Sequence, residues 1–183
     1  MLSLVSILLF LLAAFIGYFF LSGFIWGAGY YPTSKKEIDV VARLLDLREG
    51  SKFYDLGSGY GRMIVTMSER YKASSVGIEI DPVKCWWTRQ VIKGKKLTGL
   101  VTILRSNFLK VNLQNADGIF VFLTRETKIM EKLRMKIIHE CKPGTKVVSF
   151  EHRFKEWTPT RIEGKLFLYV TPESDSVKTP VDT

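Results

Sequence analysis

A cluster of three glycines follows a short β-prone run and is the part of the chain best suited to binding chemistry. The segment reads Phe53-Tyr-Asp-Leu-Gly-Ser-Gly-Tyr-Gly-Arg62, and a helical pattern resumes at Arg62. Glycine lets a ligand approach the backbone closely, since it has no side chain. The amides at the start of the following helix can then hold a carboxylate or a phosphate. This pattern predicts a site for an anionic group of a small ligand, although an ordinary strand-to-helix turn is the simpler alternative.

The spacing of the glycines separates two classes of cofactor. A dinucleotide-binding turn reads G-x-G-x-x-G, whereas here the third glycine comes one position early and Arg62 stands in its place. Asp55, just before the glycines, supplies a carboxylate that can accept hydrogen bonds from amino or hydroxyl donors. The loop therefore favours S-adenosylmethionine over NAD, with Gly57, Ser58 and Gly59 against the methionine end of the cofactor.

Two further segments follow strand-like runs and suit the rest of the same ligand. Glu79 ends the run Gly77-Ile-Glu-Ile-Asp81, where a ribose-binding acid stands in doubly wound nucleotide sites. Asp81 is the other acid there, but it suits the N-cap of a helix that begins at Pro82. Asn107 and Phe108 follow the next strand, and they suit the edge and the face of an adenine ring.

The elements that must position these residues alternate between strand and helix patterns. A capping box at Ser34 and Glu37 opens the first helix of the domain, and a hairpin turning at 163–164 closes the fold. We predict helices at 35–46, 62–71, 82–94 and 126–141, strands at 52–56, 75–80, 101–105, 118–123 and 145–150, and a terminal hairpin over 161–170. Seven strands of this kind match the Rossmann-like α/β sheet of class I methyltransferases, although periodicity alone also fits other doubly wound folds.

The first 34 residues contain no Asp, Glu, Lys, Arg or His, and residues 4–26 form a nearly unbroken apolar run. As a helix this run is long enough to cross about 30 Å of hydrocarbon, so we predict a transmembrane anchor. A cleaved signal peptide would have a basic start and a small-residue cleavage site, and a buried helix is seldom apolar all round. The predicted organisation is an anchor at 1–28, a catalytic domain at 29–171 and a disordered tail at 172–183.

All 27 basic and 18 acidic residues follow Ser34, so the net charge of +9 belongs to the domain. Lys35 and Lys36 directly after the apolar run predict a single-pass protein with a cytoplasmic C-terminal domain. The charge suits a surface held against anionic lipid, and nucleic-acid binding is its competing use. The only cysteines, Cys85 and Cys141, lack metal-ligand spacing, so we expect no metal site.

Taken together, these motifs resemble one family from about residue 30 to residue 169. The chain is similar to the membrane-anchored lysine methyltransferases that modify the adenine nucleotide translocase and the c-type ring protein of ATP synthase. It also resembles small archaeal lysine methyltransferases and, more distantly, the histone methyltransferases of the non-SET type. The segments that carry the resemblance are Tyr30-Tyr-Pro-Thr33, Asp55-Leu-Gly-Ser-Gly59, Gly77-Ile-Glu79, Asn107-Phe108, and Pro143-Gly-Thr145 followed by Val148-Ser149 and Trp157.

The resemblance implies a lysine acceptor on a membrane-associated protein, with Tyr30 and Thr33 folding over S-adenosylmethionine. It also implies that Asp55, Gly57, Gly59 and Glu79 bind the cofactor and that Asn107 and Phe108 hold adenine. Tyr30 to Thr33 also suit an aromatic belt at a membrane interface. Tyr60 departs from the pattern, because many relatives carry an acid there.

Methyl transfer needs placement of the two reactants and no covalent enzyme intermediate. Glu151 is the acid nearest the end of the fifth strand, and it is either a group that orients the amine or a solvated surface carboxylate. Aromatic candidates for lining an acceptor channel are Phe122, Phe150, Phe154 and Trp157. A lipid or small-molecule methyltransferase, an RNA methyltransferase and a non-enzymatic scaffold are the alternatives, and the first two would also transfer the methyl group of the same cofactor.

Overall fold

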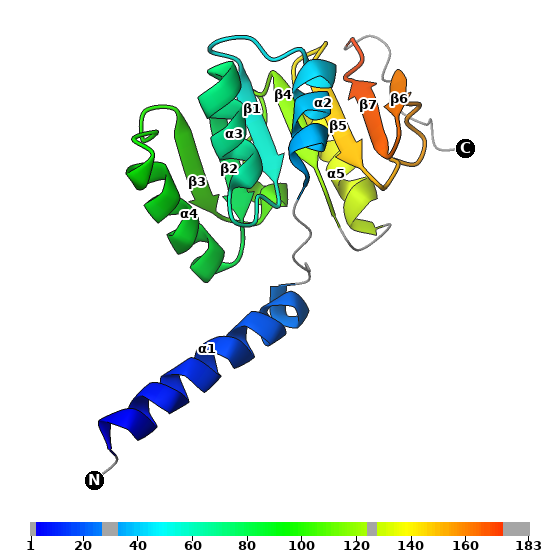
Figure 1. Cartoon of the computed structure of the whole chain (residues 1–183). Helices are drawn as coiled ribbons and strands as arrows, with labels where there is room; N and C mark the ends of the chain where they lie inside the picture. The colour runs from blue at the N-terminus through cyan, green and yellow to red at the C-terminus, as the bar shows by residue number, and fades with distance from the viewer. Residues whose placement is uncertain (1–2, 27–32, 124–127, 174–183) are drawn as a thin grey trace. The chain divides into compact units, whose positions relative to one another are not determined.

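The computed structural model describes residues 3–26, 33–123 and 128–173. The chain divides into two compact units, Met1–Tyr31 and Pro32–Thr183. The first unit contains helix α1 (Leu4–Trp26), and the second contains the sheet with its covering helices (Figure 1). Tyr30 and residues 174–183, for which a role and disorder were predicted, lie outside the described residues.

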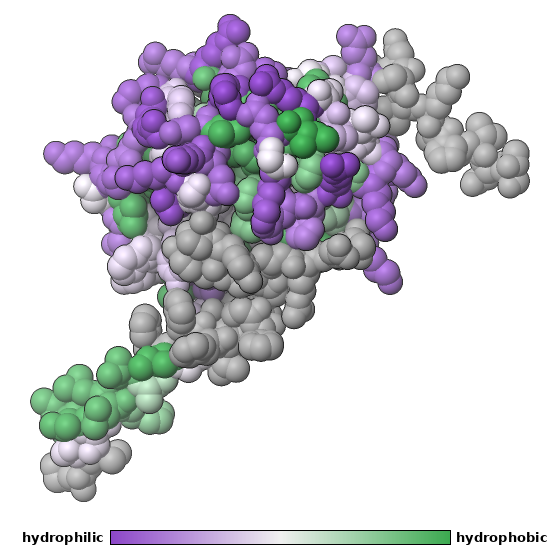
Figure 2. Space-filling model, turned by 45° about the vertical axis from the view of Figure 1, so that its right-hand side comes forward, coloured by the Kyte–Doolittle hydropathy of each residue, from purple (hydrophilic) through white to green (hydrophobic). Residues whose placement is uncertain are grey.

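Helix α1 is uncharged and largely apolar, as the sequence predicts (Figure 2). Its described apolar side chains are exposed, with Leu4 at 73% and Phe10 at 72% of their full accessible surface. Among the described residues, however, a search for helices long and apolar enough to cross a membrane finds none. The predicted helix at 4–26 is therefore present, and its prediction as a transmembrane anchor is not confirmed.

A seven-stranded sheet in the order β3-β2-β1-β4-β5-β7-β6 forms the centre of the second unit. The neighbours among β1 to β5 pair in parallel, and β7 pairs antiparallel with both β5 and β6. The strands are β1 (Lys52–Leu56), β2 (Ser74–Glu79), β3 (Val101–Arg105), β4 (Gly118–Val121), β5 (Lys146–Phe150), β6 (Arg161–Glu163) and β7 (Leu166–Val170). The predicted seven-stranded Rossmann-like fold is confirmed.

Helices cover both faces of this sheet (Figure 1). One apolar cluster joins α2 (Lys35–Leu45), α3 (Arg62–Tyr71) and α4 (Pro82–Gly94) to side chains such as Phe120 and Val148. The other joins α5 (Lys128–Glu140) to their strand neighbours Ile119 and Val147. Successive strand residues point to opposite faces, so a parallel strand covered on both sides must be apolar throughout. All four residues of β4 are accordingly buried.

Local hydrogen bonds explain where the helices begin. The Ser34 side chain accepts from the Glu37 amide at 3.2 Å, and the Ser34 amide donates to Glu37 Oε2 at 2.6 Å, which is the predicted capping box. Asp81 caps α4 by accepting from the amides of Val83 and Lys84 at 2.8 and 3.2 Å. Gly164 turns the final hairpin with a φ of +58°. These local predictions are therefore confirmed.

The order of strands also fixes where a ligand can bind. The connection after β1 leads toward β2 and β3, whereas β4 and β5 lie on the other side of β1. Such a reversal opens a crevice at the carboxyl ends of the strands on either side of it. We call this the carboxyl edge, and the segments that follow β1, β2, β3, β4 and β5 all begin there.

Candidate functional site

The glycine loop at the end of β1 has a backbone that only glycine adopts easily. Gly57, Gly59 and Gly61 have φ values of +92°, +56° and +74°. A Cβ atom built on Gly61 would lie 2.3 Å from Cγ2 of Thr88, so α4 packs directly against the loop there. A Cβ atom on Gly59 would meet nothing within 4 Å, which leaves room for a ligand beside the backbone.

Glu79 ties this loop to the end of β2. Its Oε2 accepts a hydrogen bond from the Gly59 amide at 2.7 Å, and its Oε1 accepts from the amides of Ile80 and Asp81, both at 2.9 Å. Only 7% of the residue is exposed. A carboxylate can accept about four hydrogen bonds, and three are taken, so room remains for a hydroxyl group. The predicted ribose-binding acid is therefore fixed beside the glycine loop with accepting capacity left.

Asp55 lies under the same loop, with 4% of its surface exposed. Burial raises the pKa of this carboxyl group to about 7, a hydrogen bond with Ser58 partly opposes the shift, and the negative charge of Glu79 adds to it. Two acids thus share a small, nearly dry volume. A cation placed beside them would favour the charged form of Asp55.

Ser58 is held between strands β1 and β2. Its amide donates to the Ile78 carbonyl at 3.0 Å, as the Gly57 amide does at 2.9 Å. Its Oγ would lie 2.6 Å from a Cβ atom built on Gly77, so Gly77 must lack a side chain for the loop to fit. The isolated glycine inside a strand was the sequence signal for this close approach. Thr88, which supports the loop from α4, gave no such signal.

The segment after β3 reaches the same edge, since the Ser106 amide donates to the Glu79 carbonyl at 3.0 Å. Asn107 is exposed and caps the short 3-10 helix Phe108–Lys110, where its Oδ1 accepts from the Leu109 amide at 2.9 Å. That bond leaves the side-chain amino group to point elsewhere. Phe108 is half-buried against the α5 side of the core.

The carboxyl ends of β4 and β5 carry an aromatic pair next to the glycine loop. The rings of Phe122 and Phe150 meet edge to face with centroids 4.8 Å apart. The carbonyl oxygen of Phe122 would lie 3.9 Å from a Cβ atom on Gly57. Beyond Phe150, a cavity of about 330 Å³ opens between the start of α2 and the β6–β7 hairpin. An acceptor could reach the loop along this side.

The other predicted acceptor-side residues are placed differently. Glu151 is exposed, has a φ of +64°, and pairs with Lys165 at 2.6 Å. Phe154 is buried and packs with Trp157 and Tyr169, with ring centroids 5.5 and 5.1 Å away. Phe154 and Trp157 therefore belong to the core on the α5 side. The structure places Thr33 at the start of the second unit, half-buried and directly before the capping box.

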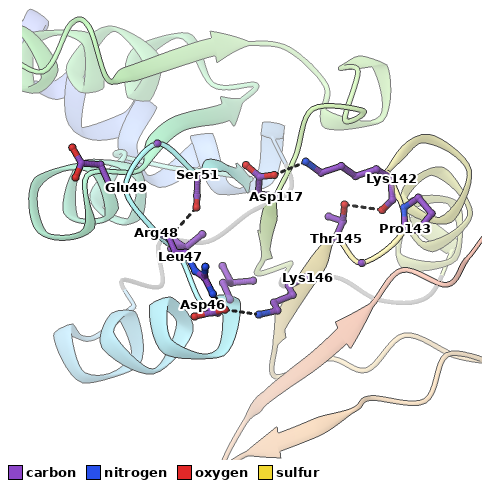
Figure 3. Close-up of a pocket in the computed structure, with 13 residues that line it drawn as sticks. Asp46, Leu47, Arg48, Glu49, Ser51, Asp117, Lys142, Pro143, Thr145 and Lys146 are labelled. Atoms are coloured by element: carbon purple, nitrogen blue, oxygen red, sulfur yellow. Dashed lines mark hydrogen bonds and ion pairs between the residues drawn. The ribbon is translucent and has the colours of Figure 1, made fainter.

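A second cavity, of about 440 Å³, lies at the opposite end of the strands (Figure 3). It opens where β1, β4 and β5 begin, and ion pairs cross it from Lys142 to Asp117 at 2.5 Å and from Lys146 to Asp46 at 3.2 Å. Its charges are thus largely neutralised within the protein, and it is remote in the fold from the carboxyl edge. Within the described part of the chain, no group of three or more His, Cys, Asp or Glu residues is arranged to hold a metal ion.

Comparison with known proteins gives this geometry a family. A model described as the ANTKMT methyltransferase domain matches residues 55–161. A protein-lysine N-methyltransferase of Saccharolobus islandicus (strain REY15A) is 34% identical over 137 residues, which cover 73% of this chain and 82% of the relative. The chain belongs to the ANTKMT methyltransferase family.

More distant members and a solved structure extend the comparison. The Homo sapiens lysine N-methyltransferase that is named for the c-type ring protein of ATP synthase is 26% identical, over 74% of this chain and 57% of the relative. The adenine nucleotide translocase lysine N-methyltransferase of Mus musculus is 27% identical, over 74% and 58%. The chain thus spans a little over half of these two relatives. A crystal structure described as an RNA methyltransferase from Salinibacter ruber, in complex with S-adenosyl-L-homocysteine, is 30% identical with a TM-score of 0.74, covering 83% of this chain and 98% of that one.

As a member of the ANTKMT methyltransferase family, this protein is an S-adenosylmethionine-dependent methyltransferase. The residues at the carboxyl edge fit the cofactor on chemical grounds. The open backbone at Gly59 leaves space, Glu79 has accepting capacity for a hydroxyl, and Asp55 offers a carboxylate to a cationic group. The reaction and the cofactor that the sequence predicted are therefore confirmed.

Proposed function

We propose that this protein transfers a methyl group from S-adenosylmethionine to the side-chain amine of a lysine in a membrane-associated protein. The observation that carries the proposal is the combination of a cofactor-sized, acid-lined edge with family members named as protein-lysine methyltransferases. The acceptor class rests mainly on those relatives.

In this proposal the two acids divide the cofactor between them. Glu79 accepts from the ribose hydroxyls, and Asp55 faces the positively charged methionine end. Gly57, Ser58 and Gly59 line the methionine moiety, and Asn107 with Phe108 holds adenine. Tyr30 and Thr33 fold over the bound cofactor. These roles agree with the placement of the described residues along one edge, and Tyr30 remains a prediction from resemblance.

The acceptor must arrive as a neutral amine, because the methyl group of the cofactor is an electrophile. A free lysine has a pKa of about 10.4, so deprotonation at pH 7 costs roughly 4 to 5 kcal/mol. The Phe122–Phe150 pair beside the glycine loop supplies an apolar surface that disfavours the charged amine. Glu151 is proposed to orient the amine, which requires its pairing with Lys165 to open.

The membrane part of the proposal rests on the N-terminal unit and on charge. Residues 1–34 carry no charge, and the described apolar side chains of α1 are exposed. Lys35 and Lys36 follow directly, which favours a cytoplasmic domain if this segment inserts. We propose that residues 1–28 hold the protein at a membrane, by insertion or by peripheral contact. An acceptor confined to the same membrane would then be met at a raised effective concentration.

Labelled S-adenosylmethionine tests the acceptor class directly. The full-length enzyme is added to membranes from a strain that lacks it, and protein, lipid and RNA fractions are separated. We expect label in protein, lost in the Asp55→Ala variant and retained in Glu49→Ala, which removes an exposed acid from the opposite end of the sheet. Label confined to lipid or RNA would overturn the proposal.

RNA methylation is the second candidate, and one observation favours it. The solved relative from Salinibacter ruber is described as an RNA methyltransferase at 30% identity. Against it, RNA amine methyltransferases carry an Asn-Pro-Pro-Tyr-like segment after the fourth strand, where this chain reads Phe122-Leu-Thr124. The RNA fraction of the same experiment decides between the two acceptors.

A further inference from the structure

Helix α4 turns an unusual surface to solvent. It buries Lys84, Cys85, Thr88 and Ile92 against the sheet, at the spacing of one helical face. Its opposite side exposes both tryptophans, Trp86 at 57% and Trp87 at 53%. We define the α4 outer face as the exposed residues Trp86, Trp87, Arg89, Gln90 and Lys93.

The charge around this face has one sign. Residues 82–116, which contain α4, β3 and the following 3-10 helix, include no Asp or Glu. Their basic residues are Lys84, Arg89, Lys93, Lys95, Lys96, Arg105 and Lys110. Lys84 pairs with Asp81, and Lys95 pairs with Glu69 at 2.7 Å. Seven basic residues in this one segment compare with a net charge of +9 for the whole chain, so the positive charge is concentrated at the β3 end of the sheet.

Large aromatic side chains beside cations suit two kinds of partner. Tryptophan prefers the boundary between hydrocarbon and water, and basic side chains bind anionic headgroups. Single-stranded RNA also uses aromatic and basic residues, but it stacks successive bases on ring platforms. Trp86 and Trp87 are consecutive on a helix, so they leave it about 100° apart and do not form one platform. The exposed apolar residues of α1 are a second feature of this chain that suits lipid.

We propose that the α4 outer face is a docking surface for an anionic lipid bilayer. Its tryptophans enter the headgroup region, and Arg89 and Lys93 bind the headgroups. Ile80, 38% exposed, lies between Glu79 and the start of α4, so this surface borders the cofactor-binding edge. Docking through α4 therefore brings the carboxyl edge to the membrane, whichever molecule accepts the methyl group.

A fluorescent probe on each side of the sheet tests this orientation in the full-length protein. Cys85 and Cys141 are buried, so a single cysteine introduced as Gln90→Cys on α4 or as Met135→Cys on α5 can be labelled with a polarity-sensitive dye. Phosphatidylcholine vesicles with or without phosphatidylglycerol are then added. Both proteins contain α1, so contacts made by α1 are common to them, and the difference reports α4.

We expect the Gln90→Cys probe to shift to blue emission with anionic vesicles, to respond weakly to neutral ones, and to lose its response in high salt. The Met135→Cys probe should change little. The response at position 90 should be lost in Arg89→Glu/Lys93→Glu and kept in Lys128→Glu/Lys132→Glu, which makes the same charge change at exposed positions of α5. It should also be lost in Trp86→Ser/Trp87→Ser.

Three results would overturn the proposal. One is an equal response of both probes to anionic vesicles. Another is a response at position 90 to a single-stranded RNA oligonucleotide with none to vesicles. The third is a response that rises with protein concentration alone, which would mean that a second copy of the chain covers this face. Because neither cofactor nor acceptor is present, the outcome is independent of the proposed lysine methylation.

Discussion

The backbone amide of Gly59 donates a hydrogen bond to the Glu79 carboxylate at 2.7 Å, and this bond links the glycine loop to the neighbouring strand. The same carboxylate accepts from the two amides that follow it. One side chain therefore shapes the loop and faces the place where a ribose is expected.

Replacing Glu79 should weaken cofactor binding strongly. We expect Glu79→Ala to lose about 2 kcal/mol or more of binding free energy, since hydrogen bonds to charged groups contribute roughly 1.5 to 3 kcal/mol. Glu79→Gln keeps the size and should give a smaller loss. Calorimetric titration with S-adenosylmethionine measures both, with Glu49→Ala as a control. An unchanged affinity in Glu79→Ala would place the ribose elsewhere.

Asp55 should release a proton when the cofactor binds near neutral pH. Its pKa of about 7 leaves it partly protonated in the free protein, and a cationic ligand favours the charged form. Binding should therefore tighten as pH rises from about 6 to 8. Calorimetry in buffers with different ionisation enthalpies detects the proton, which should be absent in Asp55→Asn. A binding enthalpy independent of buffer in the wild type would refute this role.

The same acid should lower the stability of the free protein at high pH. The folded pKa of about 7 exceeds the ordinary value of 3.8, so its contribution to stability is full below 3.8 and is lost as pH rises through 7. We expect Asp55→Asn to stabilise the cofactor-free protein by on the order of 1 kcal/mol at pH 8, and by less at pH 5. Urea unfolding at the two pH values measures the difference. A variant less stable than the wild type at pH 8 would contradict this account.

Gly61 should tolerate no side chain. Gly61→Ala combines a φ of +74° with a contact of 2.3 Å to Thr88 Cγ2, so it should cost about 2 to 4 kcal/mol. Thr88→Ser removes that methyl group, and the double variant should recover part of the loss. Unfolding curves of the single and double variants provide the test. Strictly additive effects would show that the methyl contact does not matter.

Glu151 needs a test that separates catalysis from stability. Its pair with Lys165 is on the surface, so breaking it should change the unfolding free energy by less than about 1 kcal/mol. We expect Glu151→Gln to lower kcat with cofactor affinity unchanged, whereas Lys165→Ala should leave kcat near the wild-type value. Equal kcat in all three proteins would assign Glu151 to the solvated surface.

Sequence patterns predicted the parts of the fold that depend on local chemistry. The capping box at Ser34, the Asp81 cap and the turn at Gly164 all depend on residues close in sequence. Sheet order could be inferred only from family resemblance, because strand pairing joins distant segments. The aromatic side chains at 154 and 157 were assigned to the acceptor channel, yet they pack with Tyr169, which a periodic pattern does not reveal.

The candidate site shows the same division. The glycine spacing and the acids at 55 and 79 predicted the cofactor, since the chemistry requires those residue types there. Thr88 escaped notice because a buried threonine on a helix has no distinctive pattern, and its contact with Gly61 exists only after α4 has packed on the sheet.

Identification of the methylated residue tests the central claim most directly. Membranes lacking the enzyme are incubated with full-length protein and S-adenosylmethionine carrying a deuterated methyl group, and the proteins are digested for tandem mass spectrometry. We predict deuterated methyl groups on lysine side chains of membrane-fraction proteins, present with the wild type and with Glu49→Ala and absent with Glu79→Ala. Deuterium found only on other residues, on lipid or on RNA, in a sample where the enzyme binds the cofactor, would contradict this account.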